Sequence, residues 1–260
     1  MVLPRARAGF AAGEGKTSLQ ADAAGSPARG TRQPAAIILF GSPGSGKGTQ
    51  AKLLGESLAG PHISTGDMLR QHIEAGDDIG IEAQRLIKAG KLVPDEMVNL
   101  LVQERLKKPD VRLGMILDGY PRTVNQAKVL LELMEKEGFG PSVVHLVVDY
   151  EKIVARLSGR RQCPVCGTLY SLTTNPPKVA GVCDREGAKL VTREDDREEV
   201  IRERLHEYDV QTVPILNFFR ESGVPLFEVN AGDAAPEQVR QRVCDQLLDA
   251  GVIQAAAGRK

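Results

Sequence analysis

The stretch that decides the fold is residues 37–50, which read Ile37-Ile38-Leu39-Phe40-Gly41-Ser42-Pro43-Gly44-Ser45-Gly46-Lys47-Gly48-Thr49-Gln50. Its apolar beginning predicts a buried strand, and a glycine-rich turn follows before Ala51, Leu54 and Leu58 predict one face of a helix. Glycines let main-chain N–H groups approach a ligand closely, and N–H groups at the start of a helix bind phosphate. Lys47 adds a mobile cation. We therefore expect a polyphosphate to bind at this turn.

The spacing of this turn satisfies the pattern G-x-x-x-x-G-K, but Gly48 stands where Ser or Thr is usual, and Thr49 follows one position later. The alternative interpretation is an ordinary glycine-rich turn, because a pattern this short also arises by chance. The strand before the turn and the helix after it favour the phosphate site over that alternative.

The composition of the 260-residue chain is that of a globular protein, with 42% hydrophobic and 26% charged residues. Lys plus Arg equals Asp plus Glu, at 34 each, so no excess of positive charge indicates nucleic acid or a membrane as partner. The sequence contains no apolar run of transmembrane length and no secretory signal. With four cysteines and phosphate chemistry indicated, we expect a reducing, cytoplasmic compartment.

The beginning of the chain differs in composition from the rest. Residues 1–34 are rich in Ala, Gly, Pro and Ser, and they predict a disordered extension or upstream sequence included through a wrong start codon. The alternative is an organelle transit peptide, since basic residues outnumber acidic ones, although Glu14 and Asp22 count against it. We expect one domain over residues 35–253, followed by a tail over residues 254–260.

From Ala35 onward, short apolar runs alternate with amphipathic patterns. We expect strands at residues 37–40, 62–63, 115–118, 143–148 and 225–229, a helix over residues 153–161, and a long helix that begins at Asp195 and Asp196 and is kinked by Pro214. This alternation predicts a three-layer α/β fold with a central parallel sheet. Ligands of such folds bind at the carboxyl ends of the strands.

A second group of charged residues falls at the predicted edges of loops and helices. Asp118 ends an apolar strand, where a carboxylate commonly orients Mg²⁺, although a simple turn-forming role is the alternative. A lone arginine is usually a solvated charge, but six arginines at such edges suit the transfer of a phosphoryl group between two phosphates. These are Arg70, Arg122, Arg156, Arg160, Arg193 and Arg204.

Several blocks of sequence follow the loop in a fixed order. They are Ser64-Thr65-Gly66-Asp67-Met68-Leu69-Arg70, Gly90-Lys91-Leu92-Val93, Leu117-Asp118-Gly119-Tyr120-Pro121-Arg122-Thr123 with Gln126, Gly159-Arg160-Arg161, and Arg193-Glu194-Asp195-Asp196. With the loop at residues 41–49, this succession resembles the adenylate kinase family of the long, lid-bearing type, from Ala35 to Gly251. That family also has Gly after the loop lysine. The resemblance implies a P-loop NTPase fold with AMP-binding and lid insertions.

The resemblance also implies roles for individual residues. The catalytic residues would be Lys47, Arg122, Arg160, Arg193, Arg204 and Asp118. ATP would be held by Gly44, Ser45, Gly46, Lys47, Gly48, Thr49, Arg156, Arg160, Leu169, Tyr170 and Asp233. AMP would be held by Thr65, Arg70, Lys91, Leu92, Val93, Gly119, Tyr120, Pro121, Arg122, Gln126, Arg193 and Arg204. In this assignment the Gln126 amide reads the edge of the adenine, and the match at Asp233 is the weakest.

The expected lid carries three of the four cysteines. Cys163-Pro164-Val165-Cys166 is followed by Cys183, and this spacing is typical of a tetrahedral structural zinc. Lid-bearing relatives often complete the site three residues later with Cys or Asp, where this chain has Glu186. The alternatives are a metal-free lid with reduced thiols and a zinc ribbon that binds nucleic acid. The neutral net charge and few aromatics disfavour the ribbon.

The function that these observations predict is reversible, Mg²⁺-dependent phosphoryl transfer, ATP + AMP ⇌ 2 ADP. A lid over residues 161–195 and an AMP-binding segment over residues 64–93 would exclude water when both nucleotides are bound. One alternative is a kinase for UMP or CMP, against which Gln126 and the long lid argue. Another is a nucleotide-binding module without catalysis. The resemblance implies a monomer whose partners are ATP, AMP and ADP.

Overall fold

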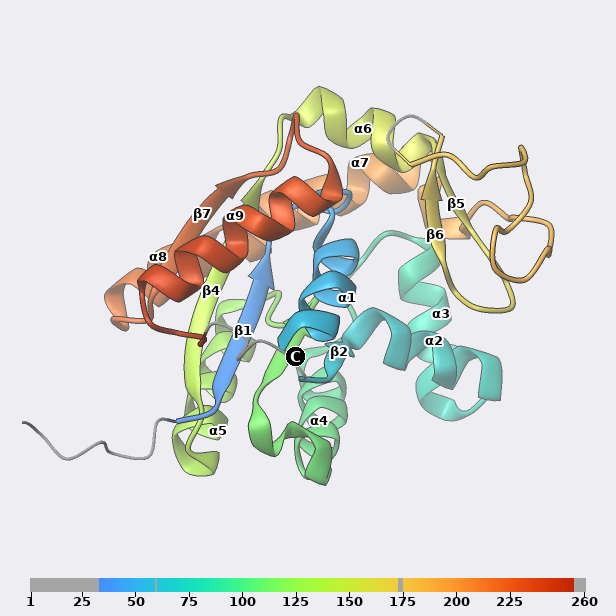
Figure 1. Ribbon diagram of the computed structural model, residues 1–260. Coiled ribbons are helices and arrows are strands. Elements are labelled where there is room, and N and C mark those ends of the chain that lie inside the picture. The colour runs from blue at the N-terminus through green and yellow to red at the C-terminus, as the bar shows by residue number, and fades with distance from the viewer. Residues whose placement is uncertain (1–32, 59, 173–174, 255–260) are drawn as a thin grey trace, which may run out of the picture. The chain divides into compact units, whose positions relative to one another are not determined.

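The computed structural model describes residues 33–58, 60–172 and 175–254 (Figure 1). Expectations for residues 1–32 and 255–260 lie outside this range. At the centre is a five-stranded sheet of order β2-β3-β1-β4-β7, in which each neighbouring pair is parallel. The strands are β1 (Ala35–Phe40), β2 (His62–Ser64), β3 (Met115–Asp118), β4 (Gly140–Val147) and β7 (Leu226–Asn230). The expected α/β fold with a central parallel sheet is confirmed.

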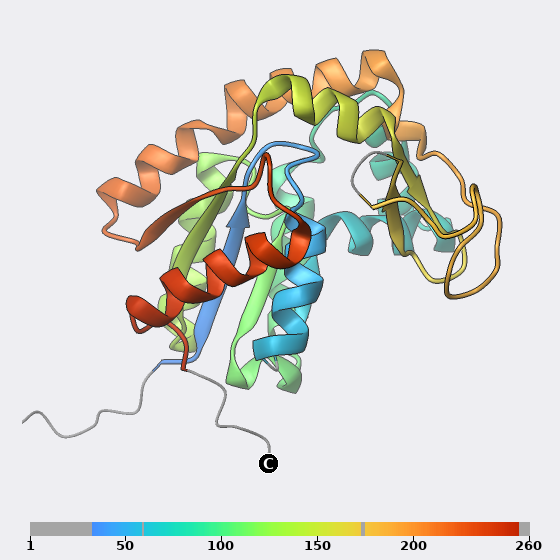
Figure 2. The same ribbon diagram turned by 45° about the horizontal axis from the view of Figure 1, so that its top comes forward.

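Helices cover both faces of this sheet, as a parallel sheet requires (Figure 2). Side chains alternate along β1, so that Ile37 and Leu39 pack in one hydrophobic cluster and Ile38 and Phe40 pack in another. The first cluster contains α1 (Lys47–Leu58) and α9 (Pro236–Asp249). The second contains α4 (Asp95–Leu106), α5 (Val124–Glu137) and α8 (Pro214–Glu221).

Two consecutive helices that contact each other follow β2 and form most of the expected AMP-binding segment. They are α2 (Thr65–Ala75) and α3 (Asp78–Lys88). Gly80 allows them to touch, because a Cβ there would lie 2.0 Å from the carbonyl oxygen of His72. Asp77 caps α3 by accepting a hydrogen bond from the Gly80 N–H at 2.8 Å.

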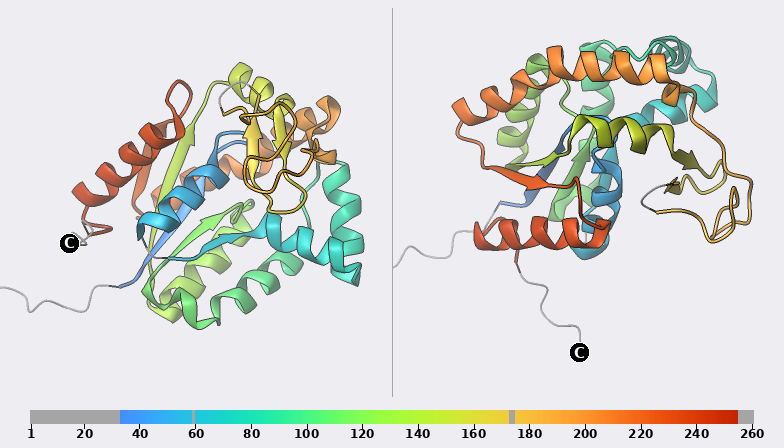
Figure 3. Two further views of the ribbon diagram at one scale, coloured as in Figure 1. Left: turned by 45° about the vertical axis from the view of Figure 1, so that its right-hand side comes forward. Right: turned by 90° about the horizontal axis from the view of Figure 1, so that it is seen from above.

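The structure corrects the expected helix over residues 153–161. Helix α6 (Tyr150–Ser158) begins three residues earlier and ends before Gly159, and the chain then enters β5 (Arg160–Gln162). Strand β5 pairs with β6 (Leu169–Ser171) in a separate two-stranded sheet. Figure 3 shows α6 leading directly into this small sheet. Because Arg160 belongs to a strand, its side chain is directed by the base of the lid and not by α6.

The expected long helix is divided. Asp195 and Asp196 lie in a short 3-10 turn (Glu194–Asp196) that precedes α7 (Glu198–Glu207), so they do not begin a helix. A π-helical segment (Tyr208–Thr212) then joins α7 to α8. Pro214 takes the first turn of α8, where its missing N–H costs no helical hydrogen bond, and the irregularity therefore precedes the proline.

Among the residues that the structure describes, none forms a helix both long and apolar enough to span a bilayer.

Candidate active site

A cavity of about 300 Å³ lies at the carboxyl edge of the sheet, where the loop after β1, the ends of β2 and β3, the α2–α3 segment and the lid meet. It brings together most of the residues singled out by sequence. These are Gly44, Ser45, Gly46, Lys47, Gly48, Thr49, Thr65, Arg70, Lys91, Leu92, Val93, Asp118, Gly119, Arg122, Gln126, Arg156, Arg160, Leu169, Tyr170, Arg193 and Arg204.

The loop after β1 forms one wall of this cavity. Gly44 has a φ of +82°, and a Cβ there would lie 2.8 Å from the Leu157 side chain, so glycine is required on both counts. The loop ends where α1 begins at Lys47, so its N–H groups lie at the positive end of the helix dipole. Within the loop, the Ser45 hydroxyl is buried without a hydrogen-bond partner. A buried polar atom of this kind is normally satisfied by a ligand or water.

The amine of Lys47 turns back onto the loop. Its Nζ donates to the carbonyl oxygens of Gly41 at 2.7 Å and Ser42 at 2.9 Å. Burial lowers the pKa of Lys47 from 10.5 to about 8, and the neighbouring Asp118 only partly opposes this effect. An incoming polyanion stabilises the protonated form of a lysine in this environment, because nearby negative charge raises the lysine's pKa.

Asp118 ends β3 beside the loop, as expected, and its Oδ2 lies 3.3 Å from Nε2 of His62. Gly48 faces this carboxylate, because a Cβ there would lie 3.2 Å from Asp118 Oδ2. The absence of a side chain at Gly48 therefore keeps a small polar space open between the loop and the carboxylate. Carboxylate oxygen and phosphate oxygen are the ligands that Mg²⁺ prefers, so the residues present fit this ion.

The arginines at the base of the lid are paired with acids. Arg160 binds Asp196 with two hydrogen bonds, of which Nε to Oδ2 measures 2.7 Å. Arg204 lies 2.8 Å from a carboxylate oxygen of Asp195 and 3.4 Å from Asp196. The Asp196 side chain is fully buried, and these two partners compensate its negative charge. Burial lowers the pKa of Arg204 to about 10, and Asp195 partly restores it.

A second group of contacts surrounds the end of β3. The buried Thr65 hydroxyl donates to the Gly119 carbonyl at 2.8 Å, and Nε of Arg122 donates to the same oxygen at 2.8 Å. A Cβ at Gly119 would lie 3.0 Å from both side chains, and its φ of +80° also favours glycine. Gln126 accepts from the Arg122 N–H at 2.7 Å and donates to Asp95 at 2.8 Å. This network fixes the side of the cavity that the resemblance assigns to AMP.

The remaining arginines each have a partner of their own. Arg70 pairs with Asp67 on α2, and Arg193 donates to the side chain of Gln162. Arg156 donates to the carbonyl oxygens of Ala231 at 2.8 Å and Gly232 at 3.0 Å, which fastens α6 to the loop after β7.

Three predicted residues are not brought into the cavity wall. Tyr120 is buried, and its hydroxyl donates to Asn99 Oδ1 at 2.6 Å, so this side chain belongs to the core. Pro121 is also buried beside it. Asp233 is exposed and pairs with Lys152, while its neighbours Ala231 and Ala234 line the cavity. The geometry is therefore compatible with a ligand contact to the backbone near Asp233 and not with one to the Asp233 side chain.

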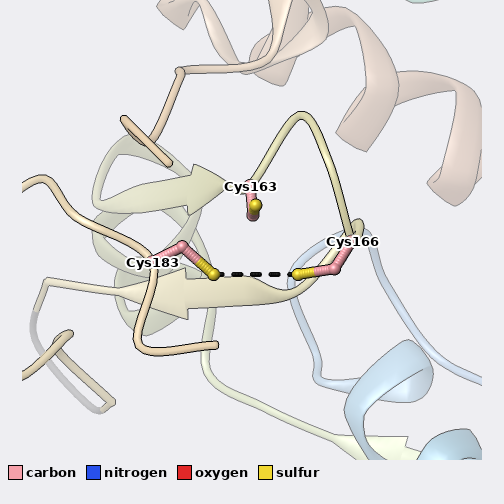
Figure 4. A group of neighbouring side chains, drawn as sticks. All are labelled: Cys163, Cys166 and Cys183. Carbon is pink, nitrogen blue, oxygen red and sulfur yellow. Dashed lines mark hydrogen bonds between the residues drawn. The ribbon is translucent and has the colours of Figure 1, made fainter. Parts of the chain in front are cut away.

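The lid cysteines form a compact cluster (Figure 4). The sulfur atoms of Cys163, Cys166 and Cys183 all lie within 4.8 Å of one another, a spacing that three thiolates can offer to one metal ion. Glu186 is exposed and its carboxylate is not part of this cluster. The sulfur atoms of three of the four expected ligands therefore converge, and the Glu186 side chain would have to rotate inward to join them.

Sequence reasoning missed several acids of the site as partners. Asp195 and Asp196 were expected at the start of a helix and in a matching block, and no role was assigned to Asp95. The position of Asp95 in the first turn after Pro94 was visible, but its pairing with Gln126 was not, since 31 residues separate them.

Comparisons with known proteins agree with this geometry. The family model described as adenylate kinase matches residues 39–224. A curated adenylate kinase of Anaeromyxobacter dehalogenans is 49% identical over 204 residues, which cover 78% of this chain and 94% of that protein. Another, of Thermosipho melanesiensis, is 48% identical over 195 residues, covering 75% and 91%. A third, of Chloroherpeton thalassium, is 49% identical over 214 residues, covering 82% and 97%.

The lowered pKa of Lys47 predicts a pH dependence of nucleotide binding. Above a pH of about 8 the empty protein loses this proton, so ATP must restore it on binding, and the dissociation constant rises by up to about tenfold per pH unit. Calorimetric titration between pH 7 and 9.5 measures this slope. Lys47→Arg is the matched control, because its guanidinium stays charged and the slope should vanish. Equal slopes for the two proteins would contradict the assignment.

Proposed function

We propose a division of roles in the cavity described above from the following premise. The chain belongs to the adenylate kinase family and transfers a phosphoryl group reversibly between ATP and AMP. The observation that carries the proposal is the convergence of the glycine-rich loop, the Gln126 amide and a group of arginines on one cavity.

The loop side holds ATP in this proposal. The N–H groups from Gly44 to Thr49 surround the phosphates, and Lys47 leaves the carbonyls of Gly41 and Ser42 to contact them. Leu169 and Tyr170 of the lid and the backbone near Asp233 contact the rest of the nucleotide. Arg156 supports this side from α6, through its hydrogen bonds to the loop after β7.

Asp118 is the residue that would hold Mg²⁺, directly or through water, in the space that Gly48 leaves open. When bound with ATP, the ion supplies positive charge to the phosphate oxygens. The chain's own contribution is to place the carboxylate at the rigid end of β3, where parallel neighbours on both sides fix the backbone.

The opposite side holds AMP in this proposal. Thr65, Gln126 and the backbone of residues 91–93 contact the nucleoside, with the backbone of residues 119–121 beside them, and Arg70 and Arg122 bind the phosphate. The acceptor is itself a phosphate oxygen, so no side chain is needed as a general base. The reaction therefore depends on placing the two nucleotides in line and on neutralising their charge.

Arg122, Arg160, Arg193 and Arg204 supply that neutralisation. Arg160 and Arg204 are held by Asp195 and Asp196 in the structure, and phosphate oxygens would replace part of these contacts when the nucleotides bind. Guanidinium groups keep their charge and bind two oxygens at once, which suits a transferring group with several anionic oxygens.

We also propose the wider organisation expected from the sequence: a catalytic domain over residues 35–253, with an AMP-binding segment over residues 64–93 and a lid over residues 161–195 that close to exclude water. The resemblance supports a monomer, the cysteine content supports a cytoplasmic compartment, and the net charge of zero is consistent with the lack of a nucleic-acid or membrane partner.

We propose a structural zinc in the lid, held by Cys163, Cys166, Cys183 and, after side-chain rotation, Glu186. The three converging sulfur atoms support this proposal. The ion would stiffen the lid and take no part in the chemistry, since the cysteines are absent from the cavity wall.

An acceptor panel tests the function. With Mg·ATP as donor, we expect AMP to give the highest kcat/KM among AMP, UMP and CMP, because Gln126 offers a donor and an acceptor to the adenine edge. Initial rates of ADP formation measure this. Equal or faster turnover of UMP or CMP would favour the pyrimidine-kinase alternative, and binding of ATP without any ADP formation would favour a non-catalytic module.

Removing a single cation tests the roles of the residues. We expect Lys47→Met and Arg122→Ala each to lower kcat by about 100-fold or more, because each removes a charge that meets the phosphates. Arg202→Ala is the matched control, since Arg202 is exposed on α7 and pairs with Glu198 at the helix surface. Near-normal kcat for either test variant would contradict the assigned role.

Metal analysis tests the lid site. We expect about one zinc per chain in protein purified without chelator, and its removal should lower the melting temperature because the metal links separate turns of the lid. Cys183→Ser should lose the metal, and Cys244→Ser on α9 is the control that keeps it. Zinc below about 0.1 equivalents in the untreated protein would show that the site is wrong.

A further inference from the structure

One acid beside the cavity has no place in the roles above. Asp95 is the first residue of α4 and does not line the cavity. Its Oδ1 accepts a hydrogen bond from Nε2 of Gln126 at 2.8 Å. Its Oδ2 accepts from the Thr123 hydroxyl at 2.8 Å and from Nδ2 of Asn125 at 3.1 Å. The carboxylate is thus held from two directions and presents a fixed acceptor to the Gln126 amide.

The other end of the Gln126 amide is fixed as well. Its Oε1 accepts from the backbone N–H of Arg122 at 2.7 Å. An N–H can only donate and an ionised carboxylate can only accept, so the two neighbours determine which end of the amide carries oxygen and which carries nitrogen. Gln126 is 2% exposed, and a flipped amide would set two donors against each other at one end and two acceptors at the other.

A fixed amide orientation has a consequence for the base that it reads. Each atom of the amide keeps one hydrogen-bonding position free: a donor on the nitrogen and an acceptor on the oxygen. Adenine carries an amino donor beside a ring-nitrogen acceptor, which match this pair. A 6-oxopurine such as hypoxanthine carries a carbonyl acceptor beside a ring N–H donor, so it requires the flipped amide.

We propose that Asp95 is a specificity-determining positioning residue, which holds the Gln126 amide in the orientation that accepts adenine and rejects 6-oxopurines. The inference rests on the AMP site proposed above. Asp95 acts through Gln126 and touches no substrate.

The test compares AMP with IMP as acceptors, since the two bases differ by this exchange of donor and acceptor. Asp95→Asn keeps the size of the side chain, but its amide can donate as well as accept, so a flipped Gln126 finds a partner at this end. We expect the ratio of kcat/KM for AMP to that for IMP to fall by about fivefold or more. We also expect the change to lie in KM for the acceptor and KM for ATP to stay constant.

Two further variants make the outcome decisive. Asp95→Ser, whose hydroxyl can also donate or accept, should produce the same fall, so the test does not depend on one variant folding. Asn125→Ala is the matched control: it removes another contact to Asp95 without touching Gln126, and the ratio should stay within twofold of the original protein. Melting temperatures of all variants separate loss of stability from loss of discrimination.

The results also separate this inference from the proposed site. Gln126→Ala should reduce the ratio at least as far as Asp95→Asn. A fall with Gln126→Ala but a change below fivefold with both Asp95 variants would overturn the role of Asp95 alone. An unchanged ratio with Gln126→Ala would overturn the base-reading site itself, and the role of Asp95 with it.

Discussion

Several cations that share one cavity repel one another, and acids beside them reduce this repulsion while no phosphate is bound. Here Asp195 and Asp196 perform that task for Arg160 and Arg204. The two acids lie in the short 3-10 turn just before α7, whereas Arg160 belongs to β5 and Arg204 to α7. The same ion pairs therefore stabilise the empty site and connect the lid to the rest of the fold.

The two halves of the cavity use polar groups in different ways. Around Gln126, each partner is restricted to donating or to accepting, so the contacts have a single arrangement and a defined direction. Around Lys47 and Arg204, the partners are backbone oxygens or carboxylates that phosphate oxygens can replace. Recognition of a base requires contacts with a fixed hydrogen-bond direction. Binding a phosphoryl group that moves between two nucleotides requires contacts that phosphate oxygens can replace.

Much of this arrangement could be predicted from the sequence. Short apolar runs, glycines and a charged residue at a strand end are local signals, so the sheet, the loop and the position of Asp118 followed from them. The partners of the arginines and of Gln126 did not, because pairing depends on side chains that meet only after folding. The division of the helix near Pro214 was also hidden, since a π-helical segment leaves no simple periodic pattern.

Two backbone hydrogen bonds between Gln162 and Val191, at 2.8 and 2.9 Å, join the two ends of the lid segment. Arg160 and Arg193 stand just outside this closure. The residues between can therefore be lengthened, shortened or replaced over evolutionary time without displacing either arginine, and the entropy of closing the loop changes only slowly with its length. Change in the lid is in this sense separate from the placement of the two arginines, while Leu169 and Tyr170 still link the lid's own sequence to the proposed ATP site.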